Sequence, residues 1–354
     1  MNSRIKLLQE KMRQTHVANI LVWEAASIRY LVDQQIAPSL WPSGLLVTAD
    51  GKPKWFKFTI YRTSKSDDFD SIDYHQNANP FEWISQSLSP GLTLIDKRWS
   101  YGWMESLRSS LPQGVSLGVD TLVDSLRSQK DEEEQERLRA ASRIADKAML
   151  AIRPFLKIGV SESEIAQKIE TYLLAEGADK VSFSPIVSFG SNTSYNRMTG
   201  GKLLEDGDNV ILDFGAKYQG YCSDITRFFC FRSHRKAQEL YQIVLQAHAA
   251  ALAMIRPGIR FSQVHHAARE VIERAGYGEH SFYPTGHGVG IGIHELFYVA
   301  STNDDLLLPG MCFSIEPGIY LRDCCGARVE DLVLVTKDGY ELLNHIPRDD
   351  IYLD

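Results

Sequence analysis

The chain has 354 residues, enough for two domains, and its 44% hydrophobic and 23% charged content is typical of a globular protein. Its formal net charge of −7 argues against a nucleic-acid partner, because nucleic-acid-binding surfaces gather Lys and Arg. The charged start at residues 1–6 does not resemble a signal peptide, and no stretch of about 18 apolar residues predicts a membrane span, so we expect no membrane partner.

Residues 1–130 are expected to form an α/β domain. Residues 5–13 have the periodicity of an amphipathic helix, and residues 18–23 form a short apolar strand. Residues 44–48 and 53–58 flank Asp50-Gly51, a strong hairpin signal. No catalytic motif is visible in this part.

A second domain, residues 131–354, is expected to begin at an acidic run. Asp131 and the three glutamates that follow suit the start of a helix, where negative charge faces the positive end of the helix dipole. A solvated helix face is the alternative interpretation, and the two are compatible. The five cysteines all lie in this domain and lack CxxC spacing, so we expect reduced thiols in a cytoplasmic protein and no cysteine metal site.

The second domain contains an internal repeat. The triplet at 152–154, Ile-Arg-Pro, recurs 103 residues later at 255–257. Each copy follows an alanine-rich helix and precedes another helix. The first of these following helices begins with a capping box from Ser161 to Glu164, and the second begins near Ser262.

Two aspartates mark the first predicted hairpin. Asp213 ends a buried strand, and Asp224 lies within the next one. A chain reversal at Tyr218-Gln219 places the two carboxylates directly opposite each other, with Cβ atoms about 5 Å apart. Such a pair repels unless a cation lies between its members. Alternatively, a bulge or a shifted register turns one of them to solvent.

Two glutamates repeat this pattern. Glu316 ends an apolar strand exactly one repeat length, 103 residues, after Asp213, and Glu330 lies in the strand that follows a turn at 323–326. We therefore expect two related hairpins that bring four carboxylates to a pseudo-twofold centre. Four negative charges balance two divalent cations, and without cations their desolvation costs several kcal/mol per ion, as a rough estimate.

A histidine between glycines completes the candidate metal site. His287 lies in TGHGVGIGIHE, where Gly286 and Gly288 permit a close backbone approach. A structural role for a lone histidine is the alternative. Oxygen-rich ligation with imidazole suits Mn, Co, Fe or Zn. His294, in the same segment, is a candidate for contact with the substrate.

The segments DFGAKYQGYCSDITR, TGHGVGIGIHE, SIEPGIY and RVED resemble those of the pita-bread metallopeptidases, in particular Xaa-Pro dipeptidases and aminopeptidase P. The resemblance implies an α/β (α+β) fold class, with a creatinase-like N-terminal domain followed by a pita-bread domain with a pseudo-twofold repeat. It also implies a small peptide substrate, a homodimer and two divalent metal ions.

Residue roles follow from the same resemblance. Asp213 is expected to chelate one ion, Asp224 and Glu330 to bridge both, and His287 and Glu316 to hold the other. A metal-bridging hydroxide is expected to attack the amide bond between an N-terminal residue and proline. In the same step Glu316 manages the proton, and His294 stabilises the intermediate or contacts the substrate.

The chain departs from the family pattern in two places. The stretch 190–198 lacks the substrate-binding histidine, so Tyr195 or Arg197 is a candidate replacement, and no arginine lies between Arg274 and Arg322 to bind a dipeptide carboxylate. A hydrolase of a non-peptide amide, similar to ectoine hydrolase, and a non-catalytic binding protein on this scaffold therefore remain alternatives. Trp41 is either a contact to the partner's pocket in a dimer or a core residue.

Overall fold

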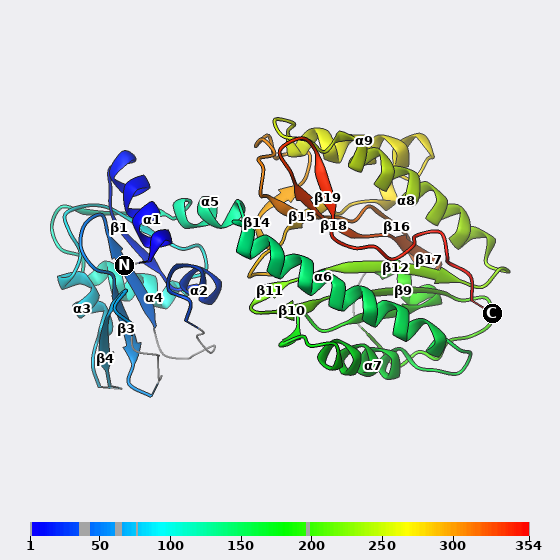
Figure 1. The fold of residues 1–354 in the computed structure, drawn as a ribbon, viewed down its shortest axis with the longest axis horizontal. Helices are drawn as coiled ribbons and strands as arrows, with labels where there is room; N and C mark the ends of the chain where they lie inside the picture. The colour runs from blue at the N-terminus through cyan, green and yellow to red at the C-terminus, as the bar shows by residue number, and fades with distance from the viewer. Residues whose placement is uncertain (1, 35–42, 61–65, 76, 196–198, 354) are drawn as a thin grey trace. The chain divides into compact units, whose positions relative to one another are not determined.

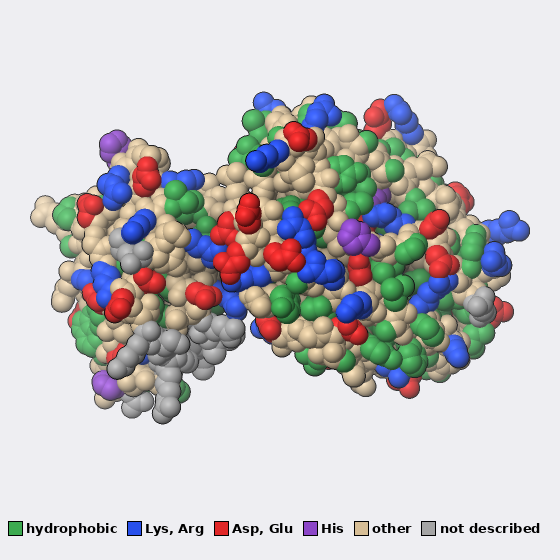
Figure 2. Space-filling view, in the orientation of Figure 1, with side chains coloured by type: hydrophobic (Ala, Val, Ile, Leu, Met, Phe, Trp, Pro, Cys, Tyr) green, Lys and Arg blue, Asp and Glu red, His purple; other side chains and the backbone are tan. Residues whose placement is uncertain are grey.

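The computed structural model describes residues 2–34, 43–60, 66–75, 77–195 and 199–353 (Figure 1). The chain separates into two compact units, residues 1–127 and 128–354. Within the described part of the chain, no helix is long and apolar enough to cross a membrane. On the face drawn in Figure 2, the acidic and basic side chains of the described residues are interspersed.

The first unit is an α/β domain around a six-stranded mixed sheet in the order β4-β3-β2-β1-β5-β6. Its strands are β1 (Val17–Val22), β2 (Gly44–Thr48), β3 (Lys54–Phe58), β4 (Asp70–Tyr74), β5 (Gly91–Ile95) and β6 (Val115–Val119). Its helices are α1 (Ser3–Gln14), α2 (Ala25–Val32), α3 (Pro80–Gln86), α4 (Tyr101–Ser109) and α5 (Leu122–Ser128), the last of which runs into the second unit. The helix predicted at 5–13 is α1, and the hairpin predicted around Asp50-Gly51 is the antiparallel pair β2–β3, so both are confirmed.

The second unit contains four long helices, and two of them begin where local sequence signals place them. The four are α6 (Glu132–Ile152), α7 (Glu162–Ala175), α8 (Arg235–Met254) and α9 (Phe261–Arg274). Asp131 caps α6 and Ser161 caps α7, each through a complete capping box, so both predicted helix starts are confirmed. A capping box satisfies backbone N–H groups that a helix start otherwise leaves without partners.

The strands of the second unit are short and frequently interrupted. They are β7 (Lys180–Val181), β8 (Ile186–Phe189), β9 (Asn209–Phe214), β10 (Ala216–Tyr218), β11 (Tyr221–Cys222), β12 (Ile225–Cys230), β13 (Gly286–Gly288), β14 (Glu295–Val299), β15 (Cys312–Ile315), β16 (Gly318–Leu321), β17 (Cys325–Arg328), β18 (Asp331–Val335) and β19 (Tyr340–Leu342). A short 3-10 segment, η2 (Gly190–Tyr195), lies between β8 and β9. The sequence predicts one continuous strand around Asp224 and another around Glu330, and both predictions are wrong. Each carboxylate lies at a break, between β11 and β12 or between β17 and β18.

The internal repeat is visible in the sheet topology. The order β12-β9-β8 in the first half corresponds to β18-β15-β13 in the second, and each half places two long helices on its sheet. One apolar core packs α6 and α7 against β8 and β9, and another packs α8 and α9 against β15 and β18. In Figure 1, α7 and the pair α8–α9 lie on opposite sides of the strands. The helices therefore cover the outer faces, and the four carboxylates lie between the halves.

Candidate metal centre

The first hairpin places Asp213 and Asp224 on one face, but not directly opposite each other. Asp213 pairs with Thr226, two residues beyond Asp224. The turn residues are Gln219 and Gly220, both with positive φ (46° and 88°), so the reversal comes one residue later than the sequence analysis places it. That shift moves the pairing by two residues, which preserves the face because side chains alternate along a strand. The two aspartates are diagonal neighbours.

The second hairpin places Glu316 opposite Glu330. The registers of β15–β18, ending at Ile315↔Asp331, and of β16–β17, starting at Gly318↔Arg328, are continuous across these glutamates. The two hairpins then meet at Thr226, which forms an isolated antiparallel bridge with Glu330. The Thr226 hydroxyl donates to Glu330 Oε2 at 2.7 Å. This bridge brings carboxylates from both halves of the repeat into one buried site.

His287 comes from the short strand β13. Its backbone N–H donates to Ser314 Oγ at 3.0 Å, and that hydroxyl donates to Glu316 Oε1 at 3.1 Å. The imidazole Nε2 lies 3.3 Å from Glu316 Oε1 and 3.6 Å from Asp224 Oδ2. A Cβ atom on Gly286 would be only 1.8 Å from the Ser314 carbonyl oxygen. Only glycine therefore permits this approach of β13 to β15, as the glycine pattern predicts.

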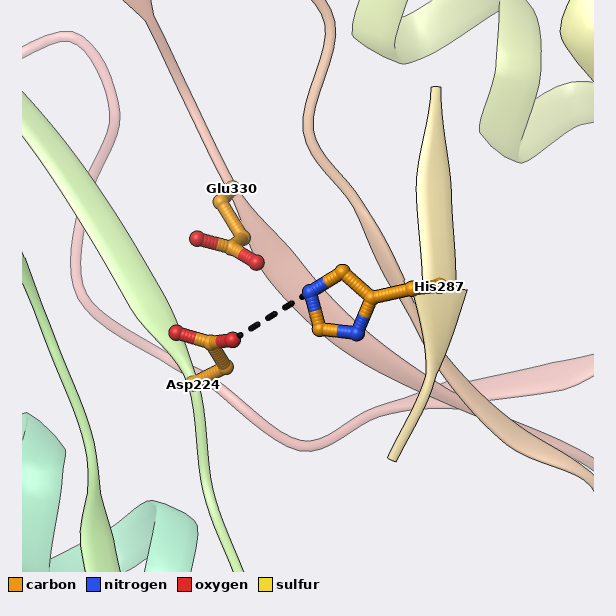
Figure 3. A group of neighbouring side chains, drawn as sticks. All are labelled: Asp224, His287 and Glu330. Carbon is orange, nitrogen blue, oxygen red and sulfur yellow. Dashed lines mark ion pairs between the residues drawn. The ribbon is translucent and has the colours of Figure 1, made fainter. Parts of the chain in front are cut away.

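Three of these side chains point toward a common centre (Figure 3). Asp224, His287 and Glu330 each offer one ligand atom, and these atoms lie within 4.8 Å of one another. Asp213, Asp224 and Glu330 each have one buried oxygen (Oδ1, Oδ1 and Oε1) without a hydrogen-bond partner. Buried polar atoms are normally satisfied, so these oxygens are free to act as ligands of a bound cation. The donor set therefore fits divalent metal ions.

The pKa directions agree with this interpretation. Burial, then the neighbouring carboxylates, raise the pKa of Asp224 and of Glu330 well above their usual ranges. Burial also raises the pKa of Asp213 and of Glu316. For His287, burial lowers the pKa and favours the neutral imidazole that coordinates metals. Bound cations would reverse the carboxylate shifts, because positive charge favours the ionised form.

Arg328 is a member of the site that the sequence analysis did not single out. Its Nη2 donates to Asp213 Oδ2 at 2.5 Å, its Nε donates to Thr226 Oγ1 at 3.0 Å, and its Nη1 donates to the Tyr320 hydroxyl at 2.9 Å. The guanidinium thus occupies one oxygen of Asp213 and leaves Oδ1 free. The available signal was its position two residues before Glu330, which on a strand puts both side chains on one face.

His294 lies beside His287, with their ring centroids 4.1 Å apart. Its loop is held by Glu295, whose carboxylate accepts from the Gly292 N–H at 3.2 Å and pairs with Lys130 at 3.1 Å. Both partners of that ion pair are almost fully buried, with side-chain exposures of 1% for Lys130 and 5% for Glu295. The structure therefore brings His294 next to His287, one of the candidate metal ligands.

The substrate-binding candidates have different outcomes. Tyr195 ends η2, and its hydroxyl donates to Asp323 Oδ1, an acceptor on the turn between β16 and β17. Its role as a substrate contact stays a prediction. Arg197 and Trp41 lie outside the described residues.

Comparisons with known proteins identify the family. Residues 136–337 match the model of metallopeptidase family M24, and residues 4–129 match the creatinase/prolidase N-terminal domain. An uncharacterized peptidase of Staphylococcus aureus is 36% identical over 85% of this chain and 87% of its own length. The chain therefore belongs to metallopeptidase family M24, and the expected enzyme class is confirmed.

Solved structures agree over the whole chain. A dipeptidase from Pyrococcus horikoshii OT3 is 31% identical with a TM-score of 0.91, covering 99% of this chain and 100% of that one. An Xaa-Pro dipeptidase from Bacillus anthracis (28% identity, TM-score 0.88) and an X-Pro aminopeptidase from Thermotoga maritima MSB8 (26%, 0.87) each cover 99% of both chains. The predicted creatinase-like and pita-bread architecture is confirmed.

Proposed function

We propose that this metallopeptidase cleaves the amide bond between an N-terminal residue and proline, using two divalent metal ions. The observation that carries the proposal is the convergence of five side chains on one buried site in which three carboxylate oxygens lack partners. The similarity to an Xaa-Pro dipeptidase and an X-Pro aminopeptidase supports proline as the residue after the cleaved bond.

The residues divide the work as follows. The ions would be held by the carboxylates and the imidazole of Asp213, Asp224, His287, Glu316 and Glu330. Two such ions supply, when bound, a water molecule deprotonated near neutral pH and positive charge for the carbonyl oxygen of the substrate.

Proton handling falls to Glu316. The Ser314 hydroxyl donates to Glu316 Oε1 at 3.1 Å and holds that oxygen in place. A carboxylate held in this way can accept the proton of the attacking water and return it to the leaving proline nitrogen. His294 would donate a hydrogen bond to the substrate carbonyl as negative charge develops there, a role supported by the 4.1 Å between its ring centroid and that of His287.

Metal analysis and a substrate series test the proposal. Purified protein is assayed with Mn²⁺, Co²⁺, Fe²⁺ or Zn²⁺ on an Xaa-Pro dipeptide, an Xaa-Pro-Xaa tripeptide, the same tripeptide with alanine in place of proline, and ectoine. We expect about two metal ions per chain and cleavage of the proline peptides only. Metal binding without cleavage of any proline peptide, or preferential cleavage of ectoine, would overturn the assignment.

The Asp224→Asn variant tests Asp224 as a proposed metal ligand. Removal of one negative charge from the proposed ligands should abolish activity and reduce the bound metal, whereas the exposed Asp304→Asn variant should leave both unchanged. Full activity in Asp224→Asn would contradict the assignment. A homodimer, the expected assembly, is tested separately by sedimentation equilibrium.

A further inference from the structure

Two adjacent cysteines lie at the turn between β16 and β17, outside the proposed metal centre. Their Sγ atoms are 3.6 Å apart. Cys324 is exposed, Cys325 is buried, and the remaining cysteines (Cys222, Cys230 and Cys312) are all buried. At this turn a reagent in solution can therefore reach the Cys324 thiol, and the buried Cys325 thiol lies in contact with it.

We propose that Cys324 and Cys325 form a dithiol modification site, which small-molecule disulfides convert reversibly into a disulfide between these two residues. The Cys324 thiolate attacks one sulfur of the reagent, forms a mixed disulfide and releases the first small thiol. Cys325 then loses its proton and attacks Cys324 Sγ, which releases the second small thiol. Two protein thiols are oxidised, one reagent disulfide is reduced, and the two protons end on the released thiols.

The different environments of the two thiols set this order. Burial, and then the neighbouring Cys324 thiol, raise the pKa of Cys325 to about 12, so few Cys325 thiolates exist near neutral pH. Thiolates, not thiols, attack disulfides, and access also limits the rate. The exposed Cys324 therefore reacts first. Once Cys324 carries the adduct, its sulfur lies next to Cys325 and the second step is intramolecular.

Geometry makes the product strained and easily reduced. The sulfurs must approach from 3.6 Å to about 2.0 Å, the length of a disulfide bond. Adjacent Cα atoms are about 3.8 Å apart, which is closer than an ordinary disulfide prefers. Strain of this kind makes a disulfide more reducible, so the modification is expected to reverse with a mild thiol.

The turn is connected to the proposed metal centre through hydrogen bonds and through strand β17. Asp323 accepts a hydrogen bond from Tyr195, and the Gly326 N–H donates to Thr193 Oγ1 at 2.8 Å. From this turn β17 runs to Arg328, which holds Asp213. Closing the ring at 324–325 therefore displaces the start of the strand that positions a proposed metal ligand. We expect lower peptidase activity after oxidation, a consequence that rests on the proposed function, whereas the modification itself does not.

The reagent 4,4′-dithiodipyridine tests the modification by mass and colour. One equivalent should release two equivalents of 4-thiopyridone from the folded, reduced protein and leave no adduct. Trypsin cuts after Arg322 and Arg328, and the resulting peptide, DCCGAR, contains both thiols. Its mass should fall by two hydrogen atoms and be restored by dithiothreitol. A retained thiopyridyl adduct, or an unchanged peptide, would overturn the proposal.

Single variants separate the two steps. Cys325→Ala should stop at the mixed disulfide, with one thiopyridone released and one adduct retained. Cys324→Ser should react much more slowly, and Cys222→Ala should behave like the wild type. If Cys325→Ala does not fold, as judged by circular dichroism, the mass of the DCCGAR peptide from the wild type still shows whether the disulfide forms.

Activity is measured on the same oxidised and reduced samples. A decrease of about tenfold is expected on oxidation, the scale seen when contacts around metal ligands are lost, with recovery after reduction. If the reduced protein cleaves no proline peptide, the proposed function fails while the peptide map still reports on the dithiol site. If the oxidised and the reduced protein have equal peptidase activity, the expected effect of the modification on catalysis is contradicted.

Discussion

Arg328 Nη2 lies 2.5 Å from Asp213 Oδ2, although the two residues are 115 positions apart in the chain. Glu330 shows a similar arrangement, because its Oε2 accepts from Thr226 while its Oε1 has no partner. In each of these two carboxylates, one oxygen accepts a hydrogen bond from the protein and the other has no hydrogen-bond partner. The orientation of these proposed ligands is therefore set before any ion binds, which reduces the cost of ordering them on binding.

Replacement of Arg328 should impair the site without removing a proposed ligand. Arg328→Lys keeps the charge but loses the guanidinium fork that joins Asp213, Thr226 and Tyr320. We expect a loss of about tenfold or more in metal affinity, measured by titration, and in activity. Arg274→Lys, on the exposed face of α9, is the matched control and should change neither. Wild-type metal affinity in Arg328→Lys would refute the positioning role.

The metal-free protein should lose stability as the pH rises. Asp224 and Glu330 have raised pKa values in the folded state, so the native protein retains protons that the unfolded chain releases above pH of about 4. Their contribution to the free energy of unfolding is fully present below that pH and is lost as pH rises through the folded-state pKa values. Asp331 has a lowered pKa, and its stabilising contribution is lost only at more acidic pH. The melting temperature of metal-stripped protein should therefore be higher at pH 5 than at pH 8.

Metal addition provides the control for this pH dependence. Mn²⁺ should raise the melting temperature more at pH 8 than at pH 5, because ligands bind metal in their deprotonated form. Asp224→Asn should flatten the pH dependence of the metal-free protein. A metal-stripped protein that is equally stable at both pH values would contradict the assigned shifts.

Replacement of Lys130 should lower the free energy of unfolding. This lysine pairs with Glu295 in a buried position, so Lys130→Met removes the positive charge that neutralises this buried carboxylate. The expected loss is about 3 kcal/mol in the free energy of unfolding, measured by denaturant titration. Lys130→Met combined with Glu295→Gln should recover much of it, because the amide oxygen still accepts from the Gly292 N–H. A double variant as unstable as Lys130→Met would mean that packing, not charge, explains the loss.

Gly286 should not tolerate a side chain. Its Cβ would overlap the Ser314 carbonyl oxygen, so Gly286→Ala must push β13 away from β15. We expect a loss of about 2 kcal/mol or more in stability, together with lower activity, because His287 is the next residue. Gly201→Ala, where an added Cβ meets nothing within 4 Å, should be nearly neutral. Equal melting temperatures for both variants would show that the strand adapts freely.

Local sequence signals predicted the local structure. Asp131 starts a helix as the acidic run that follows it indicates, and Ser161 starts one as its capping box indicates, because both signals involve residues within one turn of the helix start. The register of the first hairpin was less accessible. Asp213 pairs with Thr226 because the turn residues are Gln219 and Gly220, and a turn position one residue away predicts Asp224 instead. The prediction that both aspartates lie on one face was still correct, because side chains alternate along a strand and a two-residue shift keeps the same face.

The repeat and the spacing of the four carboxylates predicted two related hairpins around a metal site, and the resemblance of four segments to the pita-bread metallopeptidases implied the architecture and the enzyme class. Spacing and segment resemblance can both be read from the sequence without knowledge of how the two halves pack. Which carboxylate oxygens of the proposed ligands accept hydrogen bonds, and which have no partner, could not be predicted from the sequence. Arg328 reaches Asp213, and Thr226 reaches Glu330, only because the two halves pack against each other, and such contacts depend on side-chain positions more than 100 residues apart.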